Sequence, residues 1–274
     1  MTACRICKKA AKKYFEGRIL HKYTIEYYYC ENCGFLQTQE PFWFDEAYKE
    51  PMDVSDTGAL LRTLYLAEVA SIIIFFQFDK SAKFLDFAGG YGLLTRRMRD
   101  IGFDFYWQDL YSPNLLARGF EYKEGGGDIG LITSFESFEH FADPLREIES
   151  MIELSKNILF TTQLLPDPVP PPDNWPYYGL GHGQHVSFYS LRTLQVIAYK
   201  YGLNLYSVPP VYMMTSKKIR PAFLEILVKL TRFGIFLYIR KAMRSRTVKD
   251  CNMLSVGDYR KGKRGLDCES RDVE

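Results

Sequence analysis

Apolar residues in the middle of the chain follow two periods that alternate along the sequence. Short β-prone runs, among them residues 84–87, 103–107 and 129–135, are separated by segments in which apolar residues recur every three or four positions. The longest helical segment, residues 57–78, precedes the first of these runs and has a wide apolar face. Strands that alternate with helices predict an α/β fold, in which a mainly parallel sheet carries helices on both faces.

The pattern changes on both sides of this region. Residues 22–29 are β-prone with partial alternation, and residues 163–183 are so rich in proline that we expect a long ordered loop. Residues 223–239 are strongly apolar but interrupted by charges, and from residue 249 the chain is charged and poor in apolar side chains. We therefore expect a ribbon at 1–40, an aromatic connector and helix at 41–80, the α/β domain at 81–215, an amphipathic helical region at 216–248, and a disordered tail at 249–274.

A glycine-rich turn follows the first strand of the predicted sheet. Residues 84–92, FLDFAGGYG, lead from an apolar strand through an acid and a turn into a helix at 93–101. Glycine permits backbone angles that a side chain forbids, and it lets a flat or charged ligand lie against the main chain. A second acid, Asp109, ends the next strand about 20 residues further on, where a ribose diol is usually held.

The acid before the glycines distinguishes two kinds of cofactor. Asp86 would repel the pyrophosphate of a dinucleotide, but it would attract the sulfonium and ammonium groups of S-adenosylmethionine (SAM). The turn resembles motif I of class I SAM-dependent methyltransferases, Asp-x-Gly-x-Gly-x-Gly, with Gly90 and Gly92 matching and Ala88 in place of the first glycine. A methyl group is tolerable there if the φ angle of Ala88 is negative. The alternative is a strand–turn–helix unit without a ligand.

This resemblance implies a doubly wound, Rossmann-like, mainly parallel sheet that binds SAM beyond the carboxyl ends of its strands. In that superfamily a segment like residues 136–145 lines the methionine side of the cofactor. Its His140 is either a catalytic base or a structural hydrogen-bonding residue. The expected cofactor-binding residues are Asp86, Ala88, Gly89, Gly90, Gly92, Asp109, Leu110, Ser134, Phe135 and Glu136.

Four cysteines near the N-terminus have the spacing of a metal site. Cys4 and Cys7 form one Cys-x-x-Cys pair, and Cys30 and Cys33 form a second after a β-prone segment. Two such pairs can place four thiolates tetrahedrally around one structural zinc ion. Free thiols and a redox pair are the alternatives, but a redox pair needs only one such motif and usually lies in a βαβ unit. A ribbon this short cannot build an adequate core, so we expect the metal to hold it together.

Composition and charge narrow the function classes. The chain is 47% hydrophobic and 16% aromatic, which is typical of a globular protein, and its formal net charge of +2 does not call for a nucleic-acid partner. We expect neither a signal peptide nor a membrane-spanning helix, and a reducing cytoplasm is the predicted location. The apolar C-terminal region packs on the catalytic domain or on a second subunit, or it lies at the inner face of the membrane with its basic residues toward lipid headgroups. The oligomeric state is not predicted.

The proline-rich loop ends in candidate catalytic residues. Aromatic rings at 175–178 are followed by His182, Gln184 and His185, which is a combination that suits a sugar: CH groups stack on rings while hydroxyls meet polar side chains. Neutral histidine suits a general base at physiological pH, and His185 is the first candidate, with His182 second. For each histidine the alternative is a purely structural role.

Taken together, the cysteine ribbon, the SAM core and residues 184–190 are similar to zinc-containing methyltransferases of sugar pathways, which include deoxysugar C-methyltransferases and relatives in surface-polysaccharide clusters. The similarity covers roughly residues 2–205. In the C-methyltransferases the matching segment carries Glu-His, whereas here Gln184 replaces the acid and His185 is kept. Those enzymes also continue into a further α/β domain. We therefore expect methylation of a sugar hydroxyl, with carbon methylation second. A ribosomal RNA methyltransferase with a four-cysteine zinc element and a SAM-binding protein without activity are the other hypotheses.

Overall fold

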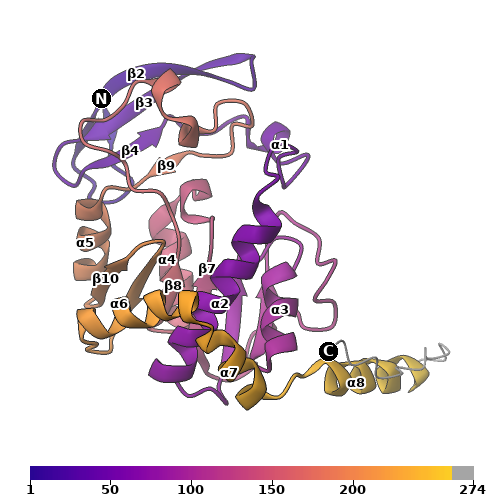
Figure 1. Cartoon of the computed structure of the whole chain (residues 1–274). Helices are drawn as coiled ribbons and strands as arrows, with labels where there is room; N and C mark the ends of the chain where they lie inside the picture. Colours follow the sequence, from indigo (N-terminus) through magenta and orange to yellow (C-terminus); the bar gives the residue numbers. More distant parts are fainter. Residues whose placement is uncertain (261–274) are drawn as a thin grey trace.

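The computed structural model describes residues 1–260. It contains two sheets, of which the smaller lies at the top of the view in Figure 1 and the larger lies below it. The larger sheet has six strands in the order β10-β11-β8-β7-β5-β6. Neighbours among β8, β7, β5 and β6 pair in parallel, whereas β11 pairs antiparallel with both β8 and β10. The strands are β5 (Lys83–Phe87), β6 (Asp104–Gln108), β7 (Ile129–Ser134), β8 (Asn157–Phe160), β10 (Asn204–Val208) and β11 (Val211–Thr215).

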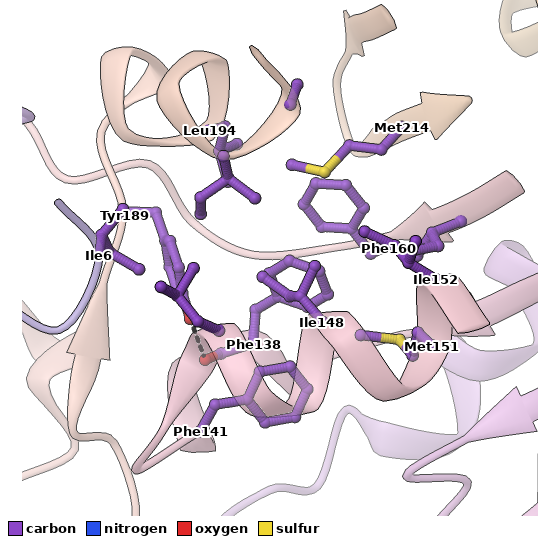
Figure 2. Close-up of a cluster of buried hydrophobic side chains, with 14 of the residues drawn as sticks. Ile6, Phe138, Phe141, Ile148, Met151, Ile152, Phe160, Tyr189, Leu194 and Met214 are labelled. Carbon is purple, nitrogen blue, oxygen red and sulfur yellow. Dashed lines mark hydrogen bonds between the residues drawn. The ribbon is translucent and has the colours of Figure 1, made fainter. Parts of the chain in front are cut away.

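Side chains alternate along the central strands, so each face of the large sheet has its own core. Phe84 packs on one face with α2 and α3, and the neighbouring Leu85 packs on the other face with α4 and α5. Figure 2 shows the second core, in which Phe138 stacks on Phe160 with ring centroids 4.1 Å apart. The predicted α/β fold with helices on both faces of the sheet is confirmed, and the sheet is mixed because β11 is antiparallel to its neighbours. Its helices are α2 (Ala59–Gln77), α3 (Leu93–Ile101), α4 (Pro144–Leu154) and α5 (Leu191–Lys200).

Helix α2 is long and apolar enough to cross a membrane, judged by length and composition alone. In the structure it is a core helix, since it packs against α3, α6 and α7 and its residues 66, 67 and 69–74 are buried. Ser71, in the middle of this face, donates a hydrogen bond to the backbone oxygen of Ala67 and so satisfies its hydroxyl inside the helix. The apolar composition of α2 is therefore explained by packing within the catalytic domain.

The N-terminal sheet is antiparallel and has the order β1-β2-β3-β4-β9. Its last strand comes from far along the chain: Leu36 pairs with Phe188, and Gln37 pairs with Ser187. The ribbon predicted at 1–40 is thus completed by residues that lie between β8 and β10 of the larger sheet in the sequence, and it is not a self-contained unit. The strands are β1 (Thr2–Ala3), β2 (Ala10–Ile19), β3 (Tyr23–Cys30), β4 (Phe35–Thr38) and β9 (Ser187–Phe188).

The proline-rich loop lies against this N-terminal sheet. It contains two short 3-10 helices, η2 (Pro172–Asn174) and η3 (Pro176–Tyr178), and Tyr178 is buried against Tyr27 and Phe188. The aromatic connector, which includes α1 (Phe44–Ala47), joins the same cluster through Trp43, whose indole N–H donates to the backbone oxygen of Gly183 over 2.8 Å. The ribbon therefore has an apolar core supplied by distant segments, in addition to the metal that was expected to hold it together.

The C-terminal helices pack on the catalytic domain, as one of the predicted arrangements had it. Helices α6 (Pro221–Lys229), η4 (Leu230–Phe233) and α7 (Ile235–Met243) all contact α2. The disordered tail expected from residue 249 is wrong up to Arg260, because α8 (Thr247–Arg260) is helical and its Asp250 is buried against Arg99. Residues 261–274 of that expected tail lie outside the described part of the chain.

Candidate active site

Two adjoining cavities open at the carboxyl ends of β5 and β7. Strand β5 pairs with β6 on one side and β7 on the other, so the chain order reverses between β5 and β7, which is where open α/β sheets bind ligands. The larger cavity has a volume of about 560 Å³ and the smaller about 360 Å³. Both are lined by Pro51, Ala88, Gly90, Ser112, Glu136 and His140.

The glycine turn forms the floor shared by the two cavities. Gly90 and Gly92 have φ angles of 54° and 85°, and the space beside the Gly90 Cα is open, so a ligand can approach the main chain there. Gly89 has no such space, because a Cβ atom would lie 2.7 Å from the buried Asp86 Oδ2 and 2.9 Å from Trp107. Trp107 also donates its indole N–H to the Gly90 backbone oxygen over 2.8 Å. The turn is therefore fixed by contacts with Asp86 and Trp107, while the side of Gly90 that faces the cavity is open.

Ala88 departs from the sequence expectation. Its φ angle is +56°, in the left-handed region, whereas the methyl group had been considered tolerable at a negative φ. Left-handed backbone costs an L-residue about 1–2 kcal/mol, because Cβ crowds the carbonyl oxygen. Ala88 therefore stores strain that glycine, the residue of the family motif, would not carry.

Replacing Ala88 by glycine is expected to raise the free energy of unfolding by about 0.5–1 kcal/mol, because relief of strain exceeds the added entropy of the unfolded chain. Thermal unfolding followed by circular dichroism would show a midpoint higher by about 2–4 °C for each kcal/mol in a chain of this size. The matched control is Ala242→Gly on the exposed face of α7, which should lower stability by about 1 kcal/mol. A lower midpoint for Ala88→Gly would contradict the strain assigned to this position.

Asp86 lies beneath the turn and lines the larger cavity. It is 2% exposed and accepts hydrogen bonds from Thr95 Oγ1 at 3.0 Å and Thr133 Oγ1 at 3.1 Å. Burial raises the pKa of Asp86 to about 7, despite these two hydrogen bonds, which favour the ionised form. A bound cation above the turn would favour the ionised carboxylate in turn.

SAM affinity is therefore expected to fall as the pH is lowered through about 7, by at most tenfold per pH unit. Protonation of Asp86 removes the charge that attracts the cationic cofactor, so binding at low pH must release a proton. Titration calorimetry at several pH values, in two buffers of different ionisation enthalpy, measures both the affinity and the proton release. Asp86→Asn should weaken binding and flatten its pH dependence, and an equally steep profile in this variant would show that another group is responsible.

Asp109 ties the end of β6 to the glycine turn. Its Oδ2 accepts the Gly90 N–H at 2.9 Å, and its Oδ1 accepts the N–H groups of Tyr111 and Ser112 at 2.7 Å each. Asp109 and the exposed Leu110 line the smaller cavity. The structure thus places Asp109 next to the turn, as the ribose prediction requires, and the ribose contact itself stays a prediction.

The residues predicted at the end of β7 divide into two groups. Phe135 and Glu136 line the larger cavity, and Glu136 is held by a hydrogen bond from Thr161 Oγ1 at 2.7 Å and an ion pair with Arg62 at 3.4 Å. Ser134 is fully buried and hydrogen-bonds Ser137, so it supports this segment from inside the fold.

Three histidines, His140, His182 and His185, lie together in the lining of the larger cavity. The ring centroids of His185 lie 4.8 Å from those of His140 and 4.7 Å from those of His182. Burial lowers the pKa of His185 to about 3, and it also lowers the pKa values of His140 and His182. All three imidazoles are therefore neutral at physiological pH.

Gln184 has a different use from the acid that it replaces in the resembling enzymes. Its amide nitrogen donates to the backbone oxygens of Ala47 at 2.8 Å and Glu50 at 3.1 Å. Its backbone N–H donates to His182 Nδ1 at 3.1 Å. Gln184 lines the cavity, but it acts as a positioning residue that fastens the aromatic connector beside the histidines.

Sequence reasoning did not single out Tyr48, Glu139 and Tyr177 as site residues. Tyr177 and Glu139 line the larger cavity. Tyr48 and Tyr111 both line the smaller cavity, and their rings stack with centroids 4.3 Å apart. The two tyrosines were visible only as members of aromatic runs. For Glu139 the available signal was an acid directly before His140 in the sequence. Its burial could not be predicted, because it depends on packing against the segment of Val186, whose N–H donates to the Glu139 backbone oxygen.

The four predicted metal ligands come together at the N-terminal sheet. Their Sγ atoms lie within 4.8 Å of one another, with the Cys4–Cys33 and Cys7–Cys30 pairs at 3.5 Å, and all four cysteines are free. Zn–S bonds of about 2.3 Å in a tetrahedron place sulfurs about 3.8 Å apart, so the arrangement fits a zinc ion. Each knuckle is closed by a backbone hydrogen bond, from Lys8 N to Cys4 O and from Gly34 N to Cys30 O.

Comparison with known proteins identifies the fold family. Residues 61–208 match the family described as "Methyltransferase domain", whereas no curated protein is significantly similar to the chain. Similar solved structures include an O-methyltransferase family protein from Burkholderia thailandensis, with 14% identity, a TM-score of 0.44, and coverage of 58% of each chain. DesVI from Streptomyces venezuelae has 14% identity and a TM-score of 0.44, with 61% of this chain and 99% of that one covered.

A third similar structure is magnesium protoporphyrin IX methyltransferase from Synechocystis PCC 6803 with bound SAM, with 11% identity, a TM-score of 0.41, and 65% and 93% of the two chains covered. The chain spans 58% of the length of the Burkholderia protein and 42% of OxaC, another structural relative. Because the family match covers more than half of the sequence, the protein belongs to the methyltransferase-domain family.

Proposed function

We propose that this methyltransferase transfers the methyl group of SAM to a hydroxyl of a sugar, in a nucleotide sugar or a surface polysaccharide. The charge of the larger cavity is the observation that carries the proposal. Its lining includes the acids Asp53, Asp56, Asp86 and Glu136, together with Glu139, whose pKa is raised to about 8 by burial and by the charge of Glu136. Among residues 1–260, Arg62 is the one permanently cationic side chain in this lining, and it is paired with Asp56 at 2.7 Å and with Glu136 at 3.4 Å.

An acidic lining suits a cationic donor and a neutral acceptor. A carboxylate-rich cavity attracts the sulfonium of SAM, and it disfavours the phosphates of an RNA acceptor. The histidine cluster offers neutral imidazoles that can accept hydroxyl hydrogen bonds, and the neighbouring ring of Tyr177 can stack on CH groups. A volume of about 560 Å³ lies in the range of small-molecule sites, and a charged nucleotide or glycan chain can remain outside.

Within this proposal, the chain positions the acceptor and the donor in different parts of one cavity. SAM already carries a good leaving group, so the protein must align the acceptor oxygen with the methyl group and receive one proton. The acceptor hydroxyl meets the cluster of Glu139, His140 and His185, and the glycine turn holds the cofactor.

The test is transfer of tritium from methyl-labelled SAM into a panel of nucleotide sugars and oligosaccharides. We expect label in at least one sugar, sensitive to His185→Asn, while calorimetry shows that SAM affinity is retained in that variant. A control variant, Tyr199→Phe on the exposed face of α5, should transfer label at the rate of the unsubstituted protein. Label in RNA, with every sugar unlabelled, would overturn the proposal.

For the cysteine cluster we propose one structural zinc ion bound by Cys4, Cys7, Cys30 and Cys33. Because distant segments also support the N-terminal sheet, removal of zinc should loosen the two knuckles and leave the catalytic domain folded. Native mass spectrometry should show one zinc per chain, and hydrogen exchange after chelation should increase at residues 1–40 but not in β5 or β7. Global unfolding on chelation would contradict this division of roles.

A further inference from the structure

A second group of metal-capable side chains lies inside the acceptor end of the larger cavity. Glu139 and His140 belong to the 3-10 helix η1 (Phe138–His140), and His185 lies just before β9. One ligand atom from each of the three lies within 4.8 Å of the other two. The two imidazole rings are nearly perpendicular, at 83°, so they approach the same region from different directions.

Both histidines are held by hydrogen bonds through the same ring nitrogen. His185 Nδ1 lies 2.6 Å from the backbone oxygen of Tyr177, an acceptor, so this nitrogen carries the proton. His140 Nδ1 lies 2.9 Å from the hydroxyl of Tyr48. Nε2 of His185 is therefore left for a ligand, and Nε2 of His140 is left in the tautomer in which Nδ1 donates to the Tyr48 oxygen. A carbonyl or hydroxyl partner on the opposite nitrogen is the usual support of a metal-binding histidine, because it fixes the ring and its tautomer.

In the third member of the cluster, Glu139, one buried carboxylate oxygen lacks a hydrogen-bond partner among the described residues. Glu139 is 1% exposed, and its Oε2 has no hydrogen-bond partner among residues 1–260. Leaving a buried carboxylate oxygen unpaired is costly, and such oxygens are normally hydrogen-bonded, paired with a charge or bound to a metal. The nearest cation in the cavity lining, Arg62, is occupied by Asp56 and Glu136.

We propose that Glu139, His140 and His185 bind one divalent first-row transition-metal ion in the acceptor cavity. Two imidazoles and one carboxylate leave coordination positions open, as catalytic metal sites require. Bonds of about 2.0–2.2 Å bring ligand atoms to about 3–3.5 Å from one another, so the side chains close by roughly an ångström when the metal binds. The site is separate from the cysteine cluster, which is all sulfur and lies in the N-terminal sheet.

The role of this ion rests on the proposed sugar hydroxyl acceptor. The hydroxyl oxygen coordinates the ion, which lowers the pKa of the hydroxyl, and its proton passes to solvent. The alkoxide oxygen then forms a bond to the methyl carbon as the bond from that carbon to sulfur breaks. Alcohol and cationic SAM thus give methyl ether, neutral S-adenosylhomocysteine and one proton. In this arrangement His185 is a ligand, in place of the base predicted from the sequence.

Cobalt(II) titration of the full-length protein tests the site without any acceptor. Cobalt bound by thiolates gives intense sulfur charge-transfer bands, whereas a nitrogen and oxygen site gives only weak ligand-field bands. We expect a second equivalent of Co²⁺, free of sulfur bands, in the unsubstituted protein. Glu139→Gln should lose this equivalent alone, and the control Glu147→Gln, a half-buried acid of α4 that lines the smaller cavity, should keep it.

If Glu139→Gln does not fold, His185→Asn provides the same comparison, because it removes a ligand from a different segment. Absence of a second equivalent in the unsubstituted protein, or its retention in both variants, would overturn the metal site. Failure of the sugar proposal gives a different result: Co²⁺ binds as expected, but no sugar is labelled. Full sugar labelling by chelated, folded protein would show that the reaction does not use this ion, and would overturn the role given to it.

Discussion

Replacement of Gly89 by alanine is expected to reduce SAM affinity at least 100-fold, which corresponds to about 2.7 kcal/mol. The added Cβ would lie 2.7 Å from Asp86 Oδ2 and 2.9 Å from Trp107 Cδ1. Asp86 cannot move away easily, since it is buried and held by Thr95 and Thr133. The turn must therefore rise into the space that the cofactor would occupy. Titration calorimetry with SAM and with S-adenosylhomocysteine measures the loss.

A second glycine provides the control for this substitution. Gly181, in the proline-rich loop, has no heavy atom within 4 Å of its added Cβ and has no positive φ angle, so Gly181→Ala should bind SAM normally. Circular dichroism and the thermal midpoint show whether Gly89→Ala is folded. A folded Gly89→Ala variant with the SAM affinity of the unsubstituted protein would show that the cofactor does not lie on this turn.

Replacement of Asp250 by alanine is expected to lower the free energy of unfolding by about 3 kcal/mol. Arg99 and Asp250 form a bidentate ion pair with both distances at 2.8 Å, and their side chains are 2% and 3% exposed. Removing one member of a buried pair typically costs about 3–5 kcal/mol, because the other charge stays buried without its partner. Asp104 still contacts Arg99 at 2.8 Å, which places the expected value at the lower end. Urea unfolding followed by tryptophan fluorescence measures the change.

An exposed ion pair on α6 calibrates this experiment. Glu225 and Lys229 are 3.9 Å apart with side chains 53% and 73% exposed, so Glu225→Ala should change stability by less than about 0.5 kcal/mol. Equal stability of the two variants would mean that α8 does not depend on Asp250 for docking. The isosteric Asp250→Asn separates the effect of charge from that of shape.

The sequence made the cofactor end of the site predictable because its constraints are local. A strand, an acid and a glycine turn determine where the main chain can approach a ligand, and Asp86, Gly90 and Asp109 lie together as expected. The φ angle of Ala88 was not predictable in the same way. Ala88 keeps the left-handed φ angle of the motif despite its strain, because the two residues that follow it are held in place. Gly89 is packed against Asp86 and Trp107, and Gly90 is hydrogen-bonded to Asp109 and Trp107.

The acceptor end depends on long-range packing, which residue patterns alone do not reveal. Glu139 and His185 are 46 positions apart, and their segments are joined by hydrogen bonds from Val186 N–H to the Glu139 backbone oxygen at 2.8 Å, from Ser187 Oγ to the Phe141 oxygen and from Tyr189 to the Phe138 oxygen. The burial of Asp250 was missed for a related reason. A charged segment that is poor in apolar residues normally stays in solvent. Here Asp250 is buried because it forms ion pairs with two arginines of α3, Arg96 and Arg99.

The pairing of β4 with β9 has a consequence for biosynthesis. Residues 1–40 leave the ribosome early, but the strand that closes their sheet, and the rings of Tyr178 and Phe188 that fill it, are translated about 140–150 residues after β4. Closing so long a loop is entropically expensive and slow. The N-terminal sheet must therefore wait, with the edge of β4 unpaired, until strands β5 to β8 and the proline-rich loop have been translated. A chain released before Phe188 would expose that edge to aggregation and chaperones.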